Sequence, residues 1–406
     1  MLEKIHIERY NYDLPYDKIA LYPTKNRDLS KLLIYSNGNI IQDIFRNIIN
    51  YLPENSWLIF NDTKVVHARL IFYKETKAKI ELFCLEPSEG DITTQLSSKQ
   101  SVKWKCLVGN SRKWKTGILK SELKINDKDI VLTAERIETN NEFSIINFSW
   151  NYDYSFAEIL EIFGKIPLPP YINRESEDSD NTTYQTIYAN IDGSVAAPTA
   201  GLHFTSELMS EILFAGMDIS TITLHVGAGT FKPVSSESIN EHVMHAEKII
   251  ISRKFIEDLY NNFGEKYIIP IGTTSCRSIE SLYWLGLKLE NESFRENDEL
   301  FLEQWYPYLE ETSKSNISIK KSLENILLYM QKRNSNYFQA ATSLIITPGY
   351  SMKFPNALIT NFHQPKSTLL LLIAAAIGDD WKKLYDYALV NDFRFLSYGD
   401  SCLLKF

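Results

Sequence analysis

The sequence has few cysteines, no long apolar run and no basic export signal. The four cysteines, Cys84, Cys106, Cys276 and Cys402, stand far apart and form no C-x-x-C pair, which argues against a disulfide or zinc framework. The longest purely apolar run, Leu369 to Ile377, has nine residues, against the roughly 20 that span a bilayer. The opening MLEKIHIERY lacks the basic start and apolar core of a signal peptide. We therefore expect a cytoplasmic protein with no membrane partner.

Positive charge is also scarce. The formal net charge is −8, and phosphate binding usually leaves a basic footprint, so any nucleic-acid contact must be local. The chain has no P-loop, no G-x-G-x-x-G and no H-E-x-x-H motif. The sequence signals of a phosphate-cradling NTPase, a dinucleotide oxidoreductase and a zinc protease are therefore missing.

The length of 406 residues favours two or three domains. Residues 1–64 read as α/β, with a strand at Lys31 to Tyr35, an Asn37-Gly38 turn, a helix at Asp43 to Tyr51 and a strand at Ser56 to Phe60. From 65 to 150, short runs rich in β-branched and aromatic residues alternate with polar turns, and no helical period interrupts them. These patterns predict a barrel-like α/β catalytic domain, 1–64 and 151–406, interrupted by an inserted all-β domain, 65–150, which we interpret as a small β-barrel.

Four apolar strands in the second half each end in a small or polar motif. They are Ser220 to Val226, Tyr267 to Ile271, Ser343 to Ile346 and Ala357 to Ile359. In parallel α/β folds the loops after the strands converge, and helix N-termini there point N–H groups at ligands. We expect one shared site at these strand ends.

Histidines are the side chains best suited to proton transfer there. His203 and His225 lie in segments rich in Gly, Thr and Pro, where the backbone can approach a ligand closely, although hydrogen-bonded core histidines are an alternative interpretation. His242 and His245 are three positions apart, but no third ligand is in register, so we expect no metal.

Taken together, these segments resemble the S-adenosylmethionine:tRNA ribosyltransferase-isomerase family, called QueA. The resemblance follows the family's order over nearly the whole chain and is carried by Tyr12 to Pro15, Arg27 to Ser30, Asn61 to Lys64, Ala68 to Leu70, Ile166 to Ile172, Tyr184 to Ala189, Ala196 to Thr205, Leu224 to Phe231, Met244-His245, Gly272 to Ser275, Pro348 to Tyr350, Leu358 to Leu369, Arg394-Phe395 and Tyr398 to Asp400.

The resemblance implies a reaction. S-adenosyl-L-methionine donates its ribosyl unit to 7-aminomethyl-7-deazaguanine at the wobble position of a tRNA, and isomerisation gives epoxyqueuosine while adenine and methionine leave. It also implies an α/β catalytic domain interrupted by a β-barrel. We expect a monomer that needs no metal.

Hydrogens beside a sulfonium are acidic, so we expect a base to remove one and a general acid to help adenine depart. The catalytic candidates are His203, His225 and His363, with Asp62 or Asp400 orienting an imidazole. Thr273, Thr274 and Ser275, with Arg277, are expected to hold the methionine carboxylate. The motifs of the resemblance supply the other substrate-binding candidates, which are Asn61, Arg69, Tyr184, Gln185, Thr199, Gly201, Gly227, Gly229, Thr230 and Asn361.

Cations interleaved with aromatics mark a candidate tRNA contact in the β-domain. The cluster comprises Lys103, Trp104, Lys105, Arg112, Lys113, Trp114 and Lys115. The cations offset phosphate charge, and the tryptophans either stack on unpaired bases or cover the domain core.

The sequence also departs from the family pattern. Lys64, His67 and Cys276 replace other residue types, and the stretch 284–341 is longer than expected. Within it an amphipathic helix presents Ile319, Leu323, Ile326, Leu327 and Met330 on one face, which we interpret as a surface elaboration. Two alternatives stay open: a paralogue with a different acceptor, and a catalytically inactive RNA-binding protein on the same fold.

Overall fold

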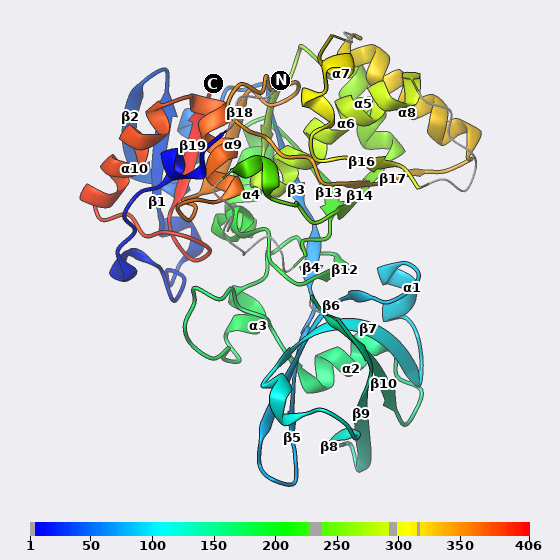
Figure 1. Cartoon of the computed structure of the whole chain (residues 1–406). Coiled ribbons are helices and arrows are strands. Elements are labelled where there is room, and N and C mark those ends of the chain that lie inside the picture. Colours follow the sequence, from blue (N-terminus) through cyan, green and yellow to red (C-terminus); the bar gives the residue numbers. More distant parts are fainter. Residues whose placement is uncertain (1–4, 141, 228–237, 292–298, 315–316) are drawn as a thin grey trace.

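The chain folds into two lobes joined by a narrow connection (Figure 1). The computed structural model describes residues 5–140, 142–227, 238–291, 299–314 and 317–406. A six-stranded and a four-stranded sheet with their helices build the upper lobe, and a seven-stranded sheet builds the lower one. Between them β4 (Thr63–Val65) pairs in parallel with β12 (Ile191–Ser194). The chain is thus a mixed α/β protein, as predicted.

The six-stranded sheet brings together strands from distant parts of the sequence. Its order is β15 (Tyr267–Pro270), β3 (Ser56–Asn61), β13 (Asp218–Leu224), β14 (Glu247–Ser252), β17 (Tyr337–Thr342) and β16 (Phe301–Leu302). The first three are parallel, while β14 runs antiparallel to both β13 and β17. Every residue of β3 is buried, as expected for a strand that is covered on both faces.

One predicted strand of this region is wrong. Ser343 to Ile346 forms no regular strand, and the strand is β17, which ends at Thr342. Leu344, Ile345 and Ile346 are buried in the core. The apolar run therefore reflects burial, which a pattern of hydrophobicity cannot distinguish from pairing in a sheet.

The four-stranded sheet has the order β18 (Ala357–Asn361), β19 (Ser401–Lys405), β1 (Lys31–Ser36) and β2 (Asn39–Ile44). The predicted turn joins β1 to β2, and Asn37 and Gly38 both have positive φ, as a tight two-residue hairpin requires. The helix predicted over Asp43 to Tyr51 is instead the end of β2 followed by the 3₁₀-helix η4 (Phe45–Tyr51).

The lower lobe is an antiparallel sheet. Its order is β11 (Gly164–Lys165), β5 (Arg69–Tyr73), β6 (Lys79–Pro87), β7 (Ser101–Gly109), β10 (Ser144–Trp150), β9 (Lys128–Thr139) and β8 (Leu119–Ile125). Two helices accompany it: α2 (Phe156–Phe163), whose Phe156 lies in the core of the sheet, and the short α1 (Ile92–Leu96), which the sequence did not predict. Sheet and core continue to Lys165, beyond the predicted boundary at 150.

Helices cover the upper lobe. They are α3 (Asp180–Thr183), α4 (Ser206–Phe214), α5 (Arg253–Asn262), α6 (Thr273–Asn291), α7 (Glu310–Lys314), α8 (Ile319–Lys332), α9 (Thr368–Ile377) and α10 (Asp380–Val390). The longest apolar run of the sequence lies in α9, and none of the helices in the described ranges has the length and apolar character needed to cross a membrane.

The segment 284–341 is not a surface elaboration, contrary to its interpretation from sequence. The predicted amphipathic helix is α8, whose Leu323, Ile326 and Met330 are buried in the main core. It packs on α6, where the Asn325 amide donates to the Gly286 carbonyl at 3.1 Å. Since β17 belongs to the six-stranded sheet, the described residues of the segment are part of the core of the upper lobe.

Candidate active site

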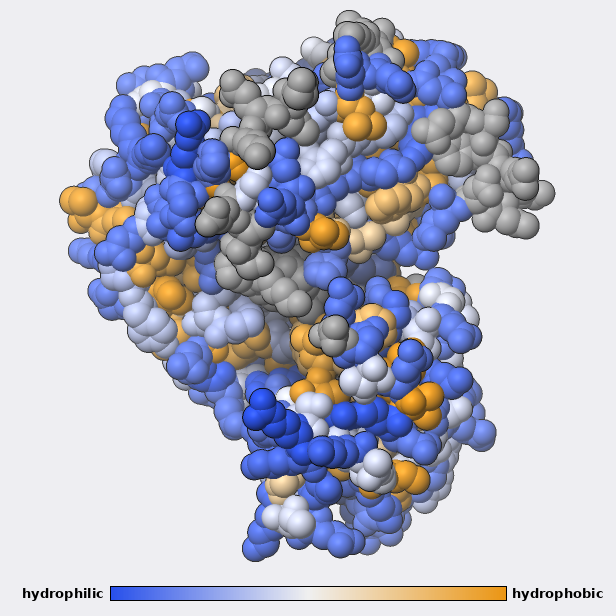
Figure 2. Space-filling view, viewed as in Figure 1, coloured by the Kyte–Doolittle hydropathy of each residue, from blue (hydrophilic) through white to orange (hydrophobic). Residues whose placement is uncertain are grey.

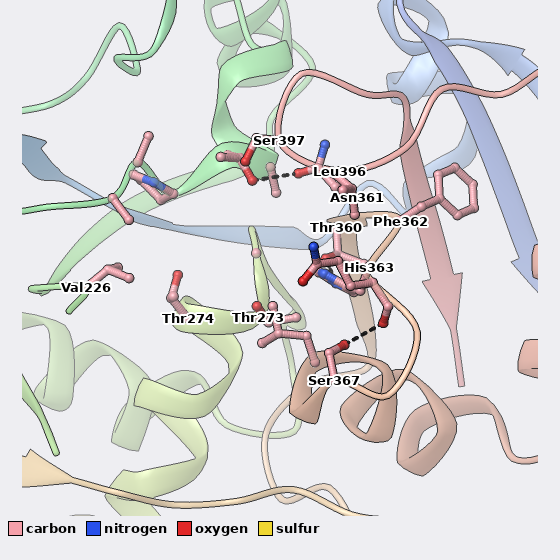
Figure 3. A pocket seen from close by; sticks show the side chains of 18 of the residues that line it. Val226, Thr273, Thr274, Thr360, Asn361, Phe362, His363, Ser367, Leu396 and Ser397 are labelled. Carbon is pink, nitrogen blue, oxygen red and sulfur yellow. Dashed lines mark hydrogen bonds between the residues drawn. The ribbon is translucent and has the colours of Figure 1, made fainter. Parts of the chain in front are cut away.

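Four parallel strands lie side by side, and residues at or after the ends of three of them, β13, β15 and β18, line one pocket. An isolated parallel bridge between Ile271 and Ile359 places β18 next to β15, which continues to β3 and β13. Three segments supply most of the lining: 196–200, 272–274 and 360–364. Figure 3 shows side chains from these strand ends around the cavity. Residues near the ends of three of the four predicted strands line this pocket, whereas Thr347 to Gly349, after the fourth, do not.

The N-terminus of α6 forms one wall. Thr273 and Thr274 both line the pocket, and the Thr274 hydroxyl is buried with no hydrogen-bond partner among the described residues. The first N–H groups of a helix have no intrahelical acceptor, so this wall offers donors to an anionic group.

The other two residues predicted to hold the carboxylate point elsewhere. The Ser275 hydroxyl donates to the Ile271 carbonyl at 2.8 Å, and Arg277 is buried in an ion pair with Glu247 of β14. Neither lines the pocket. A buried guanidinium needs a counter-charge, and β14 supplies it from a position 30 residues away in sequence.

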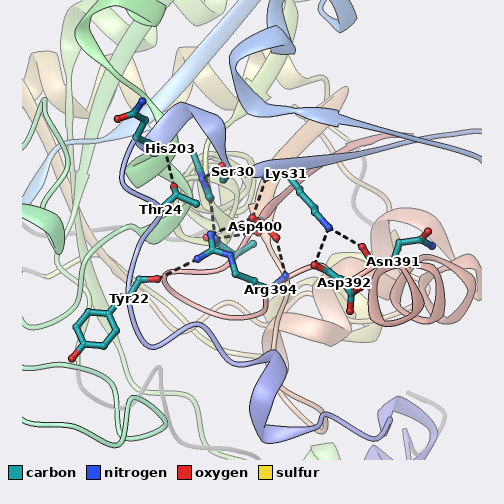
Figure 4. A network of polar contacts seen from close by, with 11 residues as sticks. Tyr22, Thr24, Ser30, Lys31, His203, Asn391, Asp392, Arg394 and Asp400 are labelled. Atoms are coloured by element: carbon teal, nitrogen blue, oxygen red, sulfur yellow. Dashed lines mark hydrogen bonds and ion pairs between the residues drawn. The ribbon is translucent and has the colours of Figure 1, made fainter.

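Asn361, at the end of β18, lines the pocket, and its side chain is hydrogen-bonded to Thr199 and His203. Thr199, which also lines the pocket, donates its hydroxyl to the Asn361 side-chain oxygen at 3.1 Å. The Asn361 amide lies 3.1 Å from His203 Nε2, and His203 Nδ1 lies 2.7 Å from the Ser30 hydroxyl (Figure 4). Because the amide donates, Nε2 accepts and Nδ1 carries the proton given to Ser30.

His203 itself does not line the pocket. It closes the 3₁₀-helix η6 (Thr199–His203), is buried, and packs against Phe45 with ring centroids 5.0 Å apart. Burial, helped by the charge of Arg394, lowers its pKa to about 3, so the ring is neutral at pH 7. Both ring nitrogens are engaged by protein groups.

His363 is the predicted histidine that does line the pocket. Its Nε2 lies 3.0 Å from the Thr360 hydroxyl, and its backbone N–H bonds to the Tyr385 hydroxyl at 3.0 Å. Within the described ranges its Nδ1 makes no hydrogen bond. Burial lowers the pKa of His363 to about 3, so its imidazole is neutral and can accept a proton.

His225 follows β13, next to the pocket residue Val226. Its Nδ1 lies 3.0 Å from the Thr63 hydroxyl, whereas its Nε2 is buried and has no partner in the part of the chain that the structure describes. Gly193 is required here, since a Cβ at that position would lie 2.7 Å from His225 Cε1. Burial lowers the pKa of His225 to about 4. Gly227 comes shortly after; Gly229 and Thr230 lie outside the described residues.

In the described residues, the two candidate carboxylates hydrogen-bond to groups other than histidine. Asp62 accepts from the Thr223 hydroxyl at 2.6 Å, and burial raises its pKa. Asp400 accepts from the backbone N–H groups of Lys31 and Arg394 and from the Arg394 guanidinium (Figure 4). Among the described residues, neither Asp62 nor Asp400 therefore orients an imidazole, contrary to the expectation.

Five further binding candidates lie away from the pocket lining. Asn61 bonds to both backbone groups of Leu224 and so joins β3 to β13. Two of the others make polar contacts: Arg69 pairs with Glu81, and Gln185 bonds to the Val65 backbone. Tyr184 packs in a buried cluster with Tyr398. Gly201 allows close packing, since a Cβ there would come within 2.9 Å of the Tyr188 ring.

Sequence reasoning missed Tyr171 and Ser397. Both line the pocket, and their hydroxyls lie 2.6 Å apart. Tyr171 belongs to the proline-rich motif at 166–172, so its position in a motif was the available signal.

A second cavity opens at the junction of the lobes and is lined in part by Lys64, His67, Glu161 and Asp192. No group of three or more metal-ligating side chains occurs in the described parts of the chain.

The two tryptophans of the predicted RNA cluster are core residues. Along β7 the side chains alternate, so Trp104 points inward with Val102 and Cys106, whereas Lys103 is exposed. Trp114 is also fully buried. Stacking of either tryptophan on an unpaired base is therefore ruled out in this conformation, and the alternative interpretation, a role in the domain core, holds.

The cations of the cluster differ in their partners. Lys105 pairs with Glu86 at 2.7 Å. Arg112, Lys113 and Lys115 are exposed around the 3₁₀-helix η5 (Ser111–Lys113), and their side chains form no ion pair with any described residue.

Comparisons with known proteins cover almost the entire chain. Residues 7–404 match the family model described as queuosine biosynthesis protein. Relatives named S-adenosylmethionine:tRNA ribosyltransferase-isomerase include one from Sulfurihydrogenibium sp., 35% identical over 403 residues, and one from Clostridioides difficile, 36% identical over 402 residues. The alignments cover 97% and 98% of this chain, and 98% of each relative.

A crystal structure of an S-adenosylmethionine tRNA ribosyltransferase from Thermotoga maritima aligns with a TM-score of 0.45 at 24% identity, over 97% of this chain and 99% of that one. The family rests on the sequence matches, which are extensive and exceed 30% identity. The chain belongs to the queuosine biosynthesis protein family, the S-adenosylmethionine:tRNA ribosyltransferase-isomerases.

Proposed function

We propose that this protein transfers the ribosyl unit of S-adenosylmethionine to 7-aminomethyl-7-deazaguanine in tRNA and isomerises it to epoxyqueuosine, releasing adenine and methionine. Family membership supports the reaction class. The observation that carries the proposal is one pocket with anion-binding groups on one wall and a neutral imidazole on another, supplied by Thr273, Thr274 and His363.

The donor's methionine carboxylate fits the start of α6. The free N–H groups of the helix and the unpartnered hydroxyl of Thr274 would receive its oxygens. Among the described residues, the pocket lining contains hydroxyl, amide and imidazole groups and no carboxylate. Because a sulfonium acidifies the neighbouring C–H without a Lewis acid, we propose that the reaction needs no metal.

His363 is our first choice for the base. Its neutral imidazole would take a proton from the ribose carbon beside sulfur, leaving the electron pair on that carbon. That pair forms a C=C bond to the adjacent ring carbon as its bond to the ring oxygen breaks, and the ring oxygen forms a C=O bond at the carbon that carries adenine. Adenine then departs with the electrons of its C–N bond and takes up a proton from a general acid. We propose His225, whose Nε2 has no partner, as the second proton-transfer group.

His203 acts through Asn361 in this proposal. Both of its nitrogens are engaged, and it stands behind the lining, so we assign it the positioning of the Asn361 amide against the substrate. Accurate placement of such a group matters because a shift of about 1 Å can cost on the order of 100-fold in rate.

The seven-stranded sheet is proposed to hold the RNA. We propose that the segment 65–150, inserted between the two parts of the catalytic domain, contacts the tRNA through its exposed cations while the wobble base enters the pocket. All four cysteines are free and buried, as in proteins of the reducing cytoplasm, where we place this reaction. We propose a monomer as the active unit.

Release of adenine from S-adenosylmethionine, measured with and without precursor tRNA, tests the function. Release that depends on tRNA carrying the 7-aminomethyl base supports it. Release without that RNA indicates a paralogue with a different acceptor, and no release with retained tRNA binding indicates an RNA-binding protein that has lost catalysis.

A further inference from the structure

His363 lies on a loop, and two tyrosine hydroxyls hold its backbone on both sides. The loop joins β18 to α9, so no helix or strand fixes the direction in which the imidazole points. The His363 N–H donates to the Tyr385 hydroxyl at 3.0 Å, and the Tyr12 hydroxyl donates to the His363 carbonyl. Both backbone polar groups of this residue are therefore satisfied by side chains from distant parts of the sequence.

The two tyrosines come from opposite ends of the chain. Tyr12 follows the 3₁₀-helix η1 (Ile7–Tyr10), and Tyr385 lies in α10, 22 residues after His363. Their rings meet edge to face with centroids 5.1 Å apart. In Figure 1 the N-terminal segment, in blue, lies beside α10, in red. The fold thus brings two remote elements together at the loop that carries His363.

The tyrosine rings belong to the interior of the upper lobe. Hydrophilic residues make up much of the visible surface in Figure 2, whereas Tyr385 is buried in the main core and Tyr12 packs against it. Phe395 lies near both, with ring centroids 6.0 Å from Tyr385 and 6.1 Å from Tyr12. Burial raises the pKa of both hydroxyls, so each keeps its proton at neutral pH. Because packed rings have little freedom, the two hydroxyls bind the His363 backbone from fixed positions.

The N-terminal segment holds the same loop at a second point. The Lys366 N–H donates to the Tyr10 carbonyl at 2.9 Å, three residues after the contact that Tyr12 makes. The imidazole itself makes one hydrogen bond within the described ranges, between Nε2 and the Thr360 hydroxyl. Its direction therefore depends on how the backbone of the loop is held.

We propose that Tyr385 and Tyr12 are positioning residues, which fix the direction of the His363 imidazole toward the substrate. The inference rests on the proposed function, in which His363 is the base. Neither tyrosine belongs to the described lining of the pocket, so both act through His363 and not on the substrate. Removal of either hydroxyl leaves one polar group of the His363 backbone without its partner and lets the loop shift. A shift of about 1 Å at a catalytic group can cost on the order of 100-fold in rate.

Adenine release by the full chain in the presence of precursor tRNA tests the proposal. Tyr385→Phe and Tyr12→Phe keep the packed rings and remove one hydroxyl each. Each should lower kcat about tenfold and leave the KM for S-adenosylmethionine within about twofold of the wild type. Tyr283→Phe is the matched control, because its hydroxyl donates to the Ile317 carbonyl at 3.2 Å and lies on α6, ten positions or about 15 Å beyond Thr273. This control should retain the wild-type kcat.

A double-mutant cycle separates positioning from a general loss of structure. In the His363→Gln background the proposed base is already absent, so Tyr385→Phe should cause no further fall in kcat. A structural role would lower kcat by the same factor in both backgrounds, and that result would overturn the proposal. A wild-type kcat in either folded tyrosine variant would overturn it too. If Tyr385→Phe does not fold, Tyr12→Phe in the same two backgrounds decides.

The His363 ring also supplies a readout that needs no turnover. In protein carrying isotope-labelled histidine, the NMR resonances of His363 are identified by their loss in His363→Gln. They should shift or broaden in Tyr385→Phe and stay as in the wild type in Tyr283→Phe. Unchanged His363 resonances in Tyr385→Phe contradict the proposal. Wild-type protein that releases no adenine would refute the proposed function alone, and these resonances would still test the positioning.

Discussion

Replacement of Gly286 by alanine tests whether the packing of α8 on α6 stabilises the upper lobe. A Cβ on Gly286 would lie 2.7 Å from the carbonyl carbon of Ser322 and closer still to its oxygen. Carbon atoms in contact are normally about 3.5 to 4.0 Å apart, so the two helices must separate by about 1 Å. The nearest obstructing atom is the Ser322 hydroxyl oxygen, but the other two belong to the backbone of Ser322 and cannot rotate away.

The expected cost combines two terms. Overpacking costs roughly 1 to 3 kcal/mol, and the rigid backbone contact places this site at the upper end. Alanine recovers about 1 kcal/mol because of its better helix propensity. We expect Gly286→Ala to lower the free energy of unfolding by about 2 kcal/mol. Gly227→Ala, where a Cβ would meet no atom of the described residues within 4 Å, is the control and should change it little.

The assay is urea unfolding followed by circular dichroism, together with the KM for S-adenosylmethionine. Gly286 lies 13 positions after Thr273, about 20 Å along the same helix, so a displaced α6 moves the pocket wall. KM should therefore rise together with the loss of stability. A variant with the urea midpoint and KM of the wild type would refute the packing argument.

Further predictions concern the pocket and one buried carboxylate. His363→Gln should lower kcat by about 100-fold or more, because it removes the proposed base. His203→Gln should mainly raise KM and leave the pH profile of kcat unchanged. The reverse pattern would make His203 the base and His363 the positioning residue. Thr274→Val should raise the KM for S-adenosylmethionine about tenfold with kcat near wild type; an unchanged KM would place the carboxylate elsewhere. Burial raises the pKa of Glu280 to about 7, so the protonated carboxyl contributes fully to the free energy of unfolding below about pH 4.5, and this contribution is lost as the pH rises toward 7. Glu280→Gln should remove this pH dependence of stability. If the variant keeps the pH dependence, another group causes it. Activity abolished by a chelator and restored by zinc would refute a metal-free reaction.

The fold was predictable where pattern alone decides the outcome. The amphipathic period from Ile319 predicted α8, and the Asn37-Gly38 turn predicted a hairpin. Prediction failed where a buried strand and a buried irregular segment have the same apolar pattern. The segment from Ser343 to Ile346 is buried but forms no strand. The length of the segment 284–341 suggested a surface loop, although its apolar residues belong to the core.

For the site, the sequence identified the meeting of strand ends but not the direction of individual side chains. Thr274 and Arg277 are neighbours on α6, yet one lines the pocket and the other pairs with Glu247. A histidine among small residues predicts that the backbone approaches a ligand closely. His203 instead hydrogen-bonds to the side chain of Asn361. Such partners are distant in sequence, and only the fold brings them together.

The order of strands in the six-stranded sheet has a consequence for synthesis on the ribosome. The buried strand β3 ends at Asn61, but its neighbour β13 begins at Asp218 and β15 at Tyr267. At about 5 to 20 residues per second, β3 waits roughly 10 to 30 s for its first partner. The antiparallel lobe, whose strands lie between Arg69 and Lys165, emerges in the meantime and can form first. The nascent chain therefore carries a folded module beside an unpaired apolar strand, which makes Ser56–Asn61 a natural segment for a chaperone to cover.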